Sequence, residues 1–158
     1  MAVLEVLAVE RVSVANEAEG VVRTKDAALQ RLAALLAHGR SDVSEAEVLA
    51  ALSEREKLQS TGVGGGVAVP HGSLDKLDRQ LGALLVCPHP IPFDAIDGEP
   101  VSILFALVGP KRASAEHLKI LARVSRLLRS ESFRQKLVQA AHGSDAYSLI
   151  AVTEAAPA

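Results

Sequence analysis

The sequence predicts an α/β protein: a single domain with a small mixed β-sheet flanked by helices. Three observations lead to this prediction. The 158 residues suit one domain, helical periodicity occupies both ends of the chain, and short apolar runs of strand length occupy the middle. Strands separated by helices early in the chain and a hairpin-like pair later favour a mixed sheet over a purely parallel one. We expect the domain at residues 5–150 and a frayed tail at 151–158.

Two helices are predicted in the first part of the domain. Thr24 is a suitable N-cap for the first helix, which ends near residue 38. Its apolar stripe follows the helical spacing i, i+3, i+4, i+7 and consists of Leu29, Leu32, Ala33 and Leu36. Ser44 and Glu47 have the spacing of a capping box, which begins a second helix that ends in the charged run 54–57.

Four segments have the length and apolar character of strands: residues 11–14, 67–69, 81–87 and 101–108. Residues 59–66 are interpreted as a loop, and the segment Pro70-His71-Gly72 is expected to stop the second strand. The pair Asp97-Gly98 predicts a tight turn between the last two strands.

The pattern is helical again from Ser114, which is predicted to cap the next helix. One apolar stripe consists of Leu118, Leu121, Val124, Ser125 and Leu128, and a second of Phe133, Leu137 and Ala140 or Ala141. Ser144 is expected to cap a last short helix that reaches about Ile150.

Charge and apolar patterning exclude several classes of protein. The net charge is −2, and no long run of one sign occurs, which argues against nucleic acid or an anionic membrane as a partner. No window approaches the roughly 20 apolar residues needed to span a bilayer, and the N-terminus lacks a signal-peptide core. The single cysteine fits a reducing compartment. We therefore expect a cytoplasmic protein that does not insert into a membrane.

The most unusual segment is the glycine-rich stretch before His71, in which four of the 11 glycines occupy five positions, 62 and 64–66. A nucleotide-binding loop is one interpretation of such a cluster. That fingerprint follows a strand and opens a helix, whereas these glycines follow a helix and open a β-like run. A P-loop is excluded because no Gly-Lys-Ser/Thr is present. The alternative is that the glycines shape a pocket around His71.

His71 is the candidate nucleophile of this segment. Pro70 constrains the approach to it, and Gly72 removes one neighbouring side chain, so the imidazole could be rigidly presented. A neutral imidazole has an unprotonated nitrogen that can attack phosphorus. From the spacing alone, a loop histidine that merely caps a turn is an equally good interpretation.

One family resemblance bears on this choice. Residues 60–72 read S-T-G-V-G-G-G-V-A-V-P-H-G, and resemble the active-site segment of the type-2 enzyme IIA family of the bacterial phosphoenolpyruvate-dependent phosphotransferase system. Residues 55–56, 90–101 and 117–122 resemble further motifs of that family in order and spacing. The resemblance covers essentially the whole chain. It departs at Gly65, where many members have asparagine, so a polar contact of that asparagine would be absent.

The resemblance implies a IIA-like fold in which His71 is the phosphoacceptor. Arg55 and His117 would support it, and Thr61, Gly64 and Gly66 would shape the phosphate pocket. A guanidinium binds phosphate oxygens bidentately, although Arg55 taken alone also reads as a solvated helix-end arginine. His117 falls in a helix first turn, where free N–H groups favour an anion, although it also reads as a boundary histidine.

The implied function is a phosphocarrier that accepts a phosphoryl group from HPr or its nitrogen-branch counterpart. A nitrogen-regulatory IIA is favoured, because no further transport domain accompanies the chain. The alternatives are a regulatory module whose phosphorylation switches binding to a transporter or sensor kinase, and the IIA subunit of a fructose/mannitol-type transporter, which passes its phosphoryl group to a IIB protein. No cofactor is expected. A metal site of His71, His89 and His117 is conceivable, but no spacing supports it.

Overall fold

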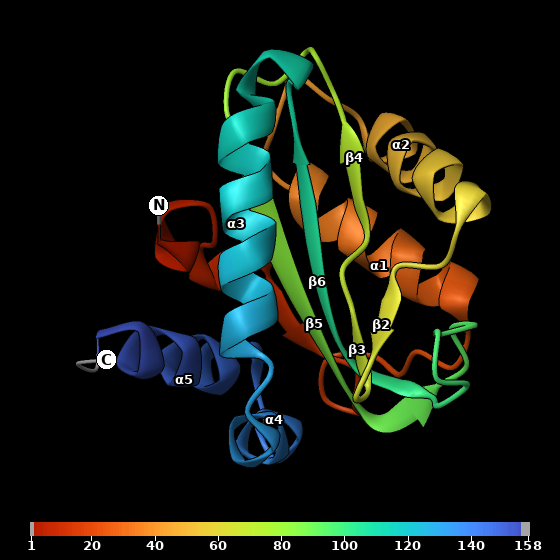
Figure 1. The fold of residues 1–158 in the computed structure, drawn as a ribbon, viewed down its shortest axis with the longest axis vertical. Coiled ribbons are helices and arrows are strands. Elements are labelled where there is room, and N and C mark those ends of the chain that lie inside the picture. Colours follow the sequence, from red (N-terminus) through yellow and green to blue (C-terminus); the bar gives the residue numbers. More distant parts are fainter. Residues whose placement is uncertain (1, 156–158) are drawn as a thin grey trace.

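The computed structural model describes residues 2–155 and confirms the predicted single α/β domain with a mixed sheet (Figure 1). The helices are α1 (Lys25–Ala37), α2 (Glu45–Leu58), α3 (Ser114–Leu127), α4 (Glu131–Val138) and α5 (Gly143–Ala155), with short 3-10 turns at Val3–Glu5, Val9–Arg11 and Lys111–Ala113. The strands are β1 (Val12–Val14), β2 (Gly62–Gly64), β3 (Val67–Ala68), β4 (His71–Ser73), β5 (Leu81–Ile91) and β6 (Val101–Gly109). Among these residues no helix is long and apolar enough to cross a membrane.

The sheet has the strand order β1-β5-β6-β3-β2, and β4 also pairs with β6. The two long strands β5 and β6 are antiparallel, whereas β1 runs parallel to β5, and both β3 and β4 run parallel to β6. Helices cover both faces: α1 and α2 lie behind the sheet and α3 crosses its front in Figure 1. Successive residues of β6 therefore enter opposite cores, which explains its continuous apolar run.

The structure corrects the prediction for the segment around His71. Residues 59–66 are not all loop, because β2 pairs with β3 in a hairpin, and His71 lies in strand β4 rather than in a loop. Pro70 interrupts the strand without ending it: it has no N–H to donate, but its carbonyl accepts a hydrogen bond from Leu107 at 3.0 Å. The pairing of β3 and β4 with β6 thus fixes the backbone on both sides of Pro70.

The first two helices follow the prediction, and α3 departs from it. Thr24 caps α1, and Ser44 and Glu47 form the predicted capping box of α2. Helix α3 follows a 3-10 turn, so that its N-cap is Ala113 and Ser114 is the first helical residue.

The apolar stripe predicted for α3 is partly wrong. The buried residues are Ile120, Val124 and Leu128, whereas Leu118 is 66% exposed. Two residues of helix rotate the side chain by about 200°, so Leu118 and Ile120 face opposite directions.

The tail predicted to fray from residue 151 is helical as far as Ala155; residues 156–158 lie outside the described part. The carboxylate of Glu154 accepts hydrogen bonds from the backbone N–H groups of Val3 and Leu4, both at 2.9 Å, and pairs with Arg123 at 3.0 Å. These contacts hold the end of α5 against the N-terminal segment and α3. Because they join residues far apart in the chain, local sequence periodicity does not predict them.

Candidate active site

His71 and His117 meet in a cleft between α2 and the start of α3. The cleft has a volume of about 710 Å³, and its lining includes Arg55 from the last turn of α2, His71 and Ser73 from β4, and Lys111 and His117 from the entry to α3. The two imidazole rings lie edge to face, with centroids 5.5 Å apart. Strands and helices distant in sequence thus bring two histidines and three cations, Arg55, Lys57 and Lys111, to one open site.

The tautomer of His71 follows from its hydrogen bond. Its Nδ1 lies 2.8 Å from the carbonyl oxygen of Val69. A carbonyl can only accept, so the neutral ring carries its proton on Nδ1 and has its free lone pair on Nε2. This bond also orients the imidazole, because Val69 precedes Pro70 in the segment fixed against β6. In the neutral ring Nε2 is therefore the nitrogen of His71 that could act as a nucleophile.

His117 is held by Gln80, with 2.8 Å between its Nδ1 and the side-chain oxygen of that residue. Burial, with a smaller contribution from the neighbouring His71, lowers the pKa of His117 from 6.5 to about 4. His117 is therefore a neutral imidazole at pH 7.

The guanidinium of Arg55 contacts the C-terminal end of α2, where Nη1 donates to the carbonyl of Gln59 at 2.9 Å. That leaves most of its donors for another group in the cleft. Gly72 allows β4 to lie close to α2, the helix that carries Arg55. A Cβ atom at residue 72 would lie only 2.9 Å from the backbone oxygen of Ala51. Strand β4 and helix α2 thus approach in a way that a larger residue would prevent.

Comparison with known proteins identifies the family. Residues 6–152 match the family described as phosphoenolpyruvate-dependent sugar phosphotransferase system, EIIA 2. The chain belongs to this family. A relative named nitrogen regulatory protein from Bradyrhizobium diazoefficiens is 42% identical over 137 residues, covering 87% of this chain and 89% of the relative.

Two solved structures agree with the assignment to the EIIA 2 family. The nitrogen regulatory protein IIA-Ntr of Neisseria meningitidis superposes with a TM-score of 0.82 at 33% identity, covering 92% of this chain and 97% of that one. The mannitol IIA of Escherichia coli, solved in complex with phosphorylated enzyme IIB, superposes with a TM-score of 0.73 at 21% identity, covering 92% and 97%. The second similarity concerns the fold.

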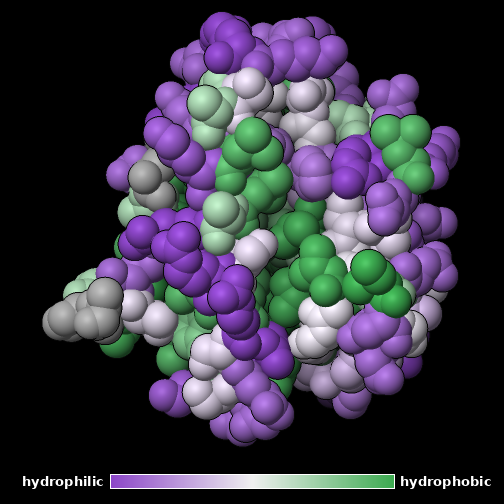
Figure 2. All heavy atoms as spheres, in the orientation of Figure 1, coloured by the Kyte–Doolittle hydropathy of each residue, from purple (hydrophilic) through white to green (hydrophobic). Residues whose placement is uncertain are grey.

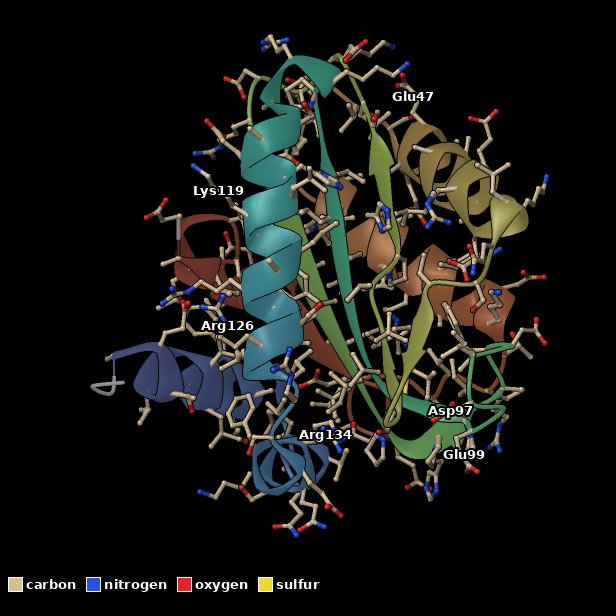
Figure 3. The ribbon with its side chains drawn as sticks, viewed as in Figure 1. Glu47, Asp97, Glu99, Lys119, Arg126 and Arg134 are labelled. Carbon is tan, nitrogen blue, oxygen red and sulfur yellow. The ribbon has the colours of Figure 1, made fainter. Side chains whose placement is uncertain are left out.

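Three residues expected at the phosphate pocket of this EIIA 2 protein lie elsewhere. Gly64 and Gly66 form the β2–β3 turn with φ angles of 97° and 79°, which glycine adopts readily. Figure 3 shows Asp97 and Arg134 at this end of the sheet, and Asp97 accepts from the N–H of Gly65 at 3.1 Å. Thr61 is buried and bonds to Glu56 instead of lining the cleft. The glycines therefore build the hairpin rather than the site.

Lys111 in the cleft and Gln80 behind His117 were not predicted from the sequence. Lys111 belongs to the short basic pair at residues 111–112, before α3. That pair is only a weak sequence signal for a cation near His71. Gln80 has no sequence signal, because a single glutamine before an apolar strand is unremarkable. His89 lies in a different cleft with His142, and residues 2–155 contain no group of three or more potential ligands that could hold a metal ion.

The lowered pKa of His117 makes stability depend on pH. Between pH 6.5 and about 4 the unfolded chain binds a proton at this position that the folded protein does not, so stability falls as the pH falls through this window. We expect acidification to cost about 2–3 kcal/mol from His117 alone. Urea unfolding at several pH values should show this loss in the native sequence and in the exposed control His38→Gln. His117→Gln should remove it, and an unchanged pH slope would contradict the burial of a neutral His117.

Proposed function

We propose that this EIIA 2 protein is a phosphocarrier that accepts a phosphoryl group on Nε2 of His71 from an HPr-like carrier. The observation that carries this proposal is the hydrogen bond from Nδ1 of His71 to Val69, which leaves Nε2 as the free nitrogen in an open cleft. A histidine that merely caps a turn could also bond to a backbone carbonyl, but that alternative gives no reason for three cations and a second histidine in the same cleft.

The chemistry requires positioning and charge stabilisation. The Nε2 lone pair of His71 forms a bond to phosphorus, while the bond from phosphorus to the donor breaks and its electron pair stays with the donor. The phosphoryl group adds about −1.5 to −2 charges at pH 7. Arg55 and Lys111 line the cleft and supply N–H donors of opposite charge. The proton stays on Nδ1 of His71 throughout, where it is donated to the carbonyl of Val69.

Arg55 is expected to stabilise the transferred group. Arg55→Ala should lower the rate of phosphoryl transfer by about 10- to 100-fold, because a hydrogen bond to a charged group is worth about 1.5–3 kcal/mol. Arg55→Lys should restore only part of the transfer rate, since an ammonium lacks the planar pair of N–H donors with which a guanidinium binds phosphate oxygens. Rapid-quench labelling with the phosphorylated carrier measures both. A normal rate in Arg55→Ala would remove this residue from the site.

A carrier that reaches His71 meets exposed leucines on both sides of the cleft. Leu58 at the end of α2 is 82% exposed and Leu118 on α3 is 66% exposed. Figure 2 shows hydrophobic residues gathered on this face. The charged residues Lys119 and Arg126 also lie along α3 (Figure 3). Isolated exposed leucines are common, but two of them flanking one cleft suit a docking surface.

Replacing Leu118 tests this docking surface. We expect Leu118→Ser to raise the KM for the phosphorylated carrier by about tenfold with little change in kcat, because about 1–2 kcal/mol of apolar contact is lost. The matched control is Val152→Ser on α5, which removes a side chain that is 70% exposed away from the cleft. Equal KM values for the two variants would show that the carrier does not use Leu118.

The relatives named nitrogen regulatory protein favour a regulatory branch for this chain over a dedicated sugar-transport subunit. The deciding experiment follows the phosphoryl group after labelling. Retention of the label and phosphorylation-dependent binding to a transporter or sensor kinase support the regulatory branch. Rapid onward transfer to a purified IIB protein supports a transport subunit.

A further inference from the structure

A buried glutamine fixes the second histidine of the cleft. Gln80 lies directly before β5, and only 2% of it is exposed. Its side-chain oxygen faces Nδ1 of His117 at 2.8 Å, and its side-chain nitrogen donates to the carbonyl of Ala113 at 3.3 Å. Gly109 makes room for the amide, because a Cβ atom at that position would overlap it. The amide is thus enclosed between the end of β6 and the turn before α3.

The two partners of Gln80 determine which way its amide points. The Ala113 carbonyl only accepts, so the NH₂ group must face it and the oxygen must face His117. Neutral His117 therefore carries its proton on Nδ1. Its Nε2 then holds a lone pair, and this is the nitrogen available to the cleft that His71 shares.

A lone pair on Nε2 is poorly suited to a phosphoryl oxygen, which needs donors. A second proton, on Nε2, would let His117 donate to Gln80 and to the phosphoryl group at once, without moving either side chain. We propose that Gln80 is a positioning residue for His117, keeping its first proton on Nδ1 so that Nε2 takes up a proton from solvent when His71 is phosphorylated. This rests on the proposed function of His71. The step forms one N–H bond and breaks one O–H bond of a hydronium ion in the solvent, which is left as water.

Phosphorylation of His71 would change the charge around His117 in the direction that favours a second proton. In the unphosphorylated protein the groups that line the cleft with it are His71 from β4, Lys111 before α3, and Arg55, Lys57 and Glu54 from α2. These cations outnumber the one carboxylate, and together with burial they oppose a proton on His117. A phosphoryl group of about −1.5 to −2 charges on His71 cancels most or all of that positive excess, and it lies on the ring next to His117.

The tautomer of His117 can be measured without any phosphoryl transfer. Long-range ¹H–¹⁵N spectra distinguish Nδ1–H, Nε2–H and doubly protonated rings, and His117→Gln identifies the signal among the five histidines. We expect Nδ1–H at pH 7 in the native sequence and in Gln80→Glu, which keeps an oxygen acceptor. Gln80→Met should shift the ring toward Nε2–H, while the exposed control Gln30→Met should not. An Nε2–H ring in the native protein, or no change in Gln80→Met, would overturn the proposal.

The same spectra of the protein phosphorylated on His71 test the second part. We expect the protonation midpoint of His117 to rise by about two pH units on phosphorylation. In Gln80→Met this rise should be smaller, and thermal unfolding of the variant checks that it is folded. A midpoint that does not move in the phosphorylated native protein would overturn proton uptake. Failure of His71 to accept any phosphoryl group would instead overturn the proposed function and leave the tautomer result standing.

Discussion

Replacing His71 by alanine is expected to abolish phosphoryl incorporation, with labelling reduced at least about 1,000-fold, because a covalent acceptor has no substitute in the cleft. His117 is the nearest other histidine, with ring centroids 5.5 Å apart, but burial lowers its pKa to about 4, which makes its Nε2 a weaker nucleophile than an ordinary imidazole nitrogen. The measurement is incorporation of radiolabel from phosphoenolpyruvate in the presence of enzyme I and an HPr-like carrier.

The remaining histidines supply controls for this experiment. His38→Gln, His89→Gln and His142→Gln should be labelled at the native rate, since none of these residues lines the cleft. His117→Gln should be labelled more slowly but to completion. Full labelling of His71→Ala would end the phosphocarrier interpretation.

Glu56→Ala is expected to lower the free energy of unfolding by about 3 kcal/mol, the largest effect on stability that we predict. The Glu56 side chain is 4% exposed and lies 2.9 Å from Nζ of Lys25. It also accepts from the N–H and the hydroxyl of Thr61, at 2.9 and 2.6 Å. The substitution leaves a partly buried ammonium and two donors of Thr61 without their acceptor.

The neighbouring Glu54 provides a matched control for stability. It lies in the same helix turn but is exposed, so Glu54→Ala should change the unfolding free energy by less than about 0.5 kcal/mol. Urea denaturation measures both variants. A loss below about 1 kcal/mol for Glu56→Ala would show that the contact of Glu56 with Lys25 and Thr61 does not stabilise the fold. Because Arg55 precedes Glu56, this contact also holds the end of α2 that borders the cleft.

Local signals in the sequence predicted much of the fold. Thr24 and Ser44 begin helices because their side chains accept from the first-turn N–H groups, an interaction that depends only on neighbouring residues. The apolar runs of β5 and β6 were long enough to be recognised as buried strands. Strand β4 was missed because it forms only by pairing with β6, across more than thirty residues of chain.

At the site, too, residues marked by local sequence signals could be predicted, whereas those that depend on long-range contacts could not. His71 could be singled out because glycine and proline surround it, and the family resemblance extended this to Arg55 and His117. The resemblance also suggested Gly64, Gly66 and Thr61, which instead form a hairpin and a buried contact with Glu56. Gln80 could not be predicted, because its role depends on Ala113 and Gly109, which only the folded chain brings to it.

The most direct test of the central claim identifies the nitrogen that carries the phosphoryl group. The protein labelled by the phosphorylated carrier should hold one phosphoryl group, on Nε2 of His71, because Val69 occupies Nδ1. ³¹P–¹⁵N correlation spectra distinguish the two phosphohistidine isomers, and mass spectrometry of peptides locates the residue. The expected result is a single Nε2-phosphohistidine at position 71. A phosphoryl group on Nδ1 of His71, or on another residue, would contradict the account.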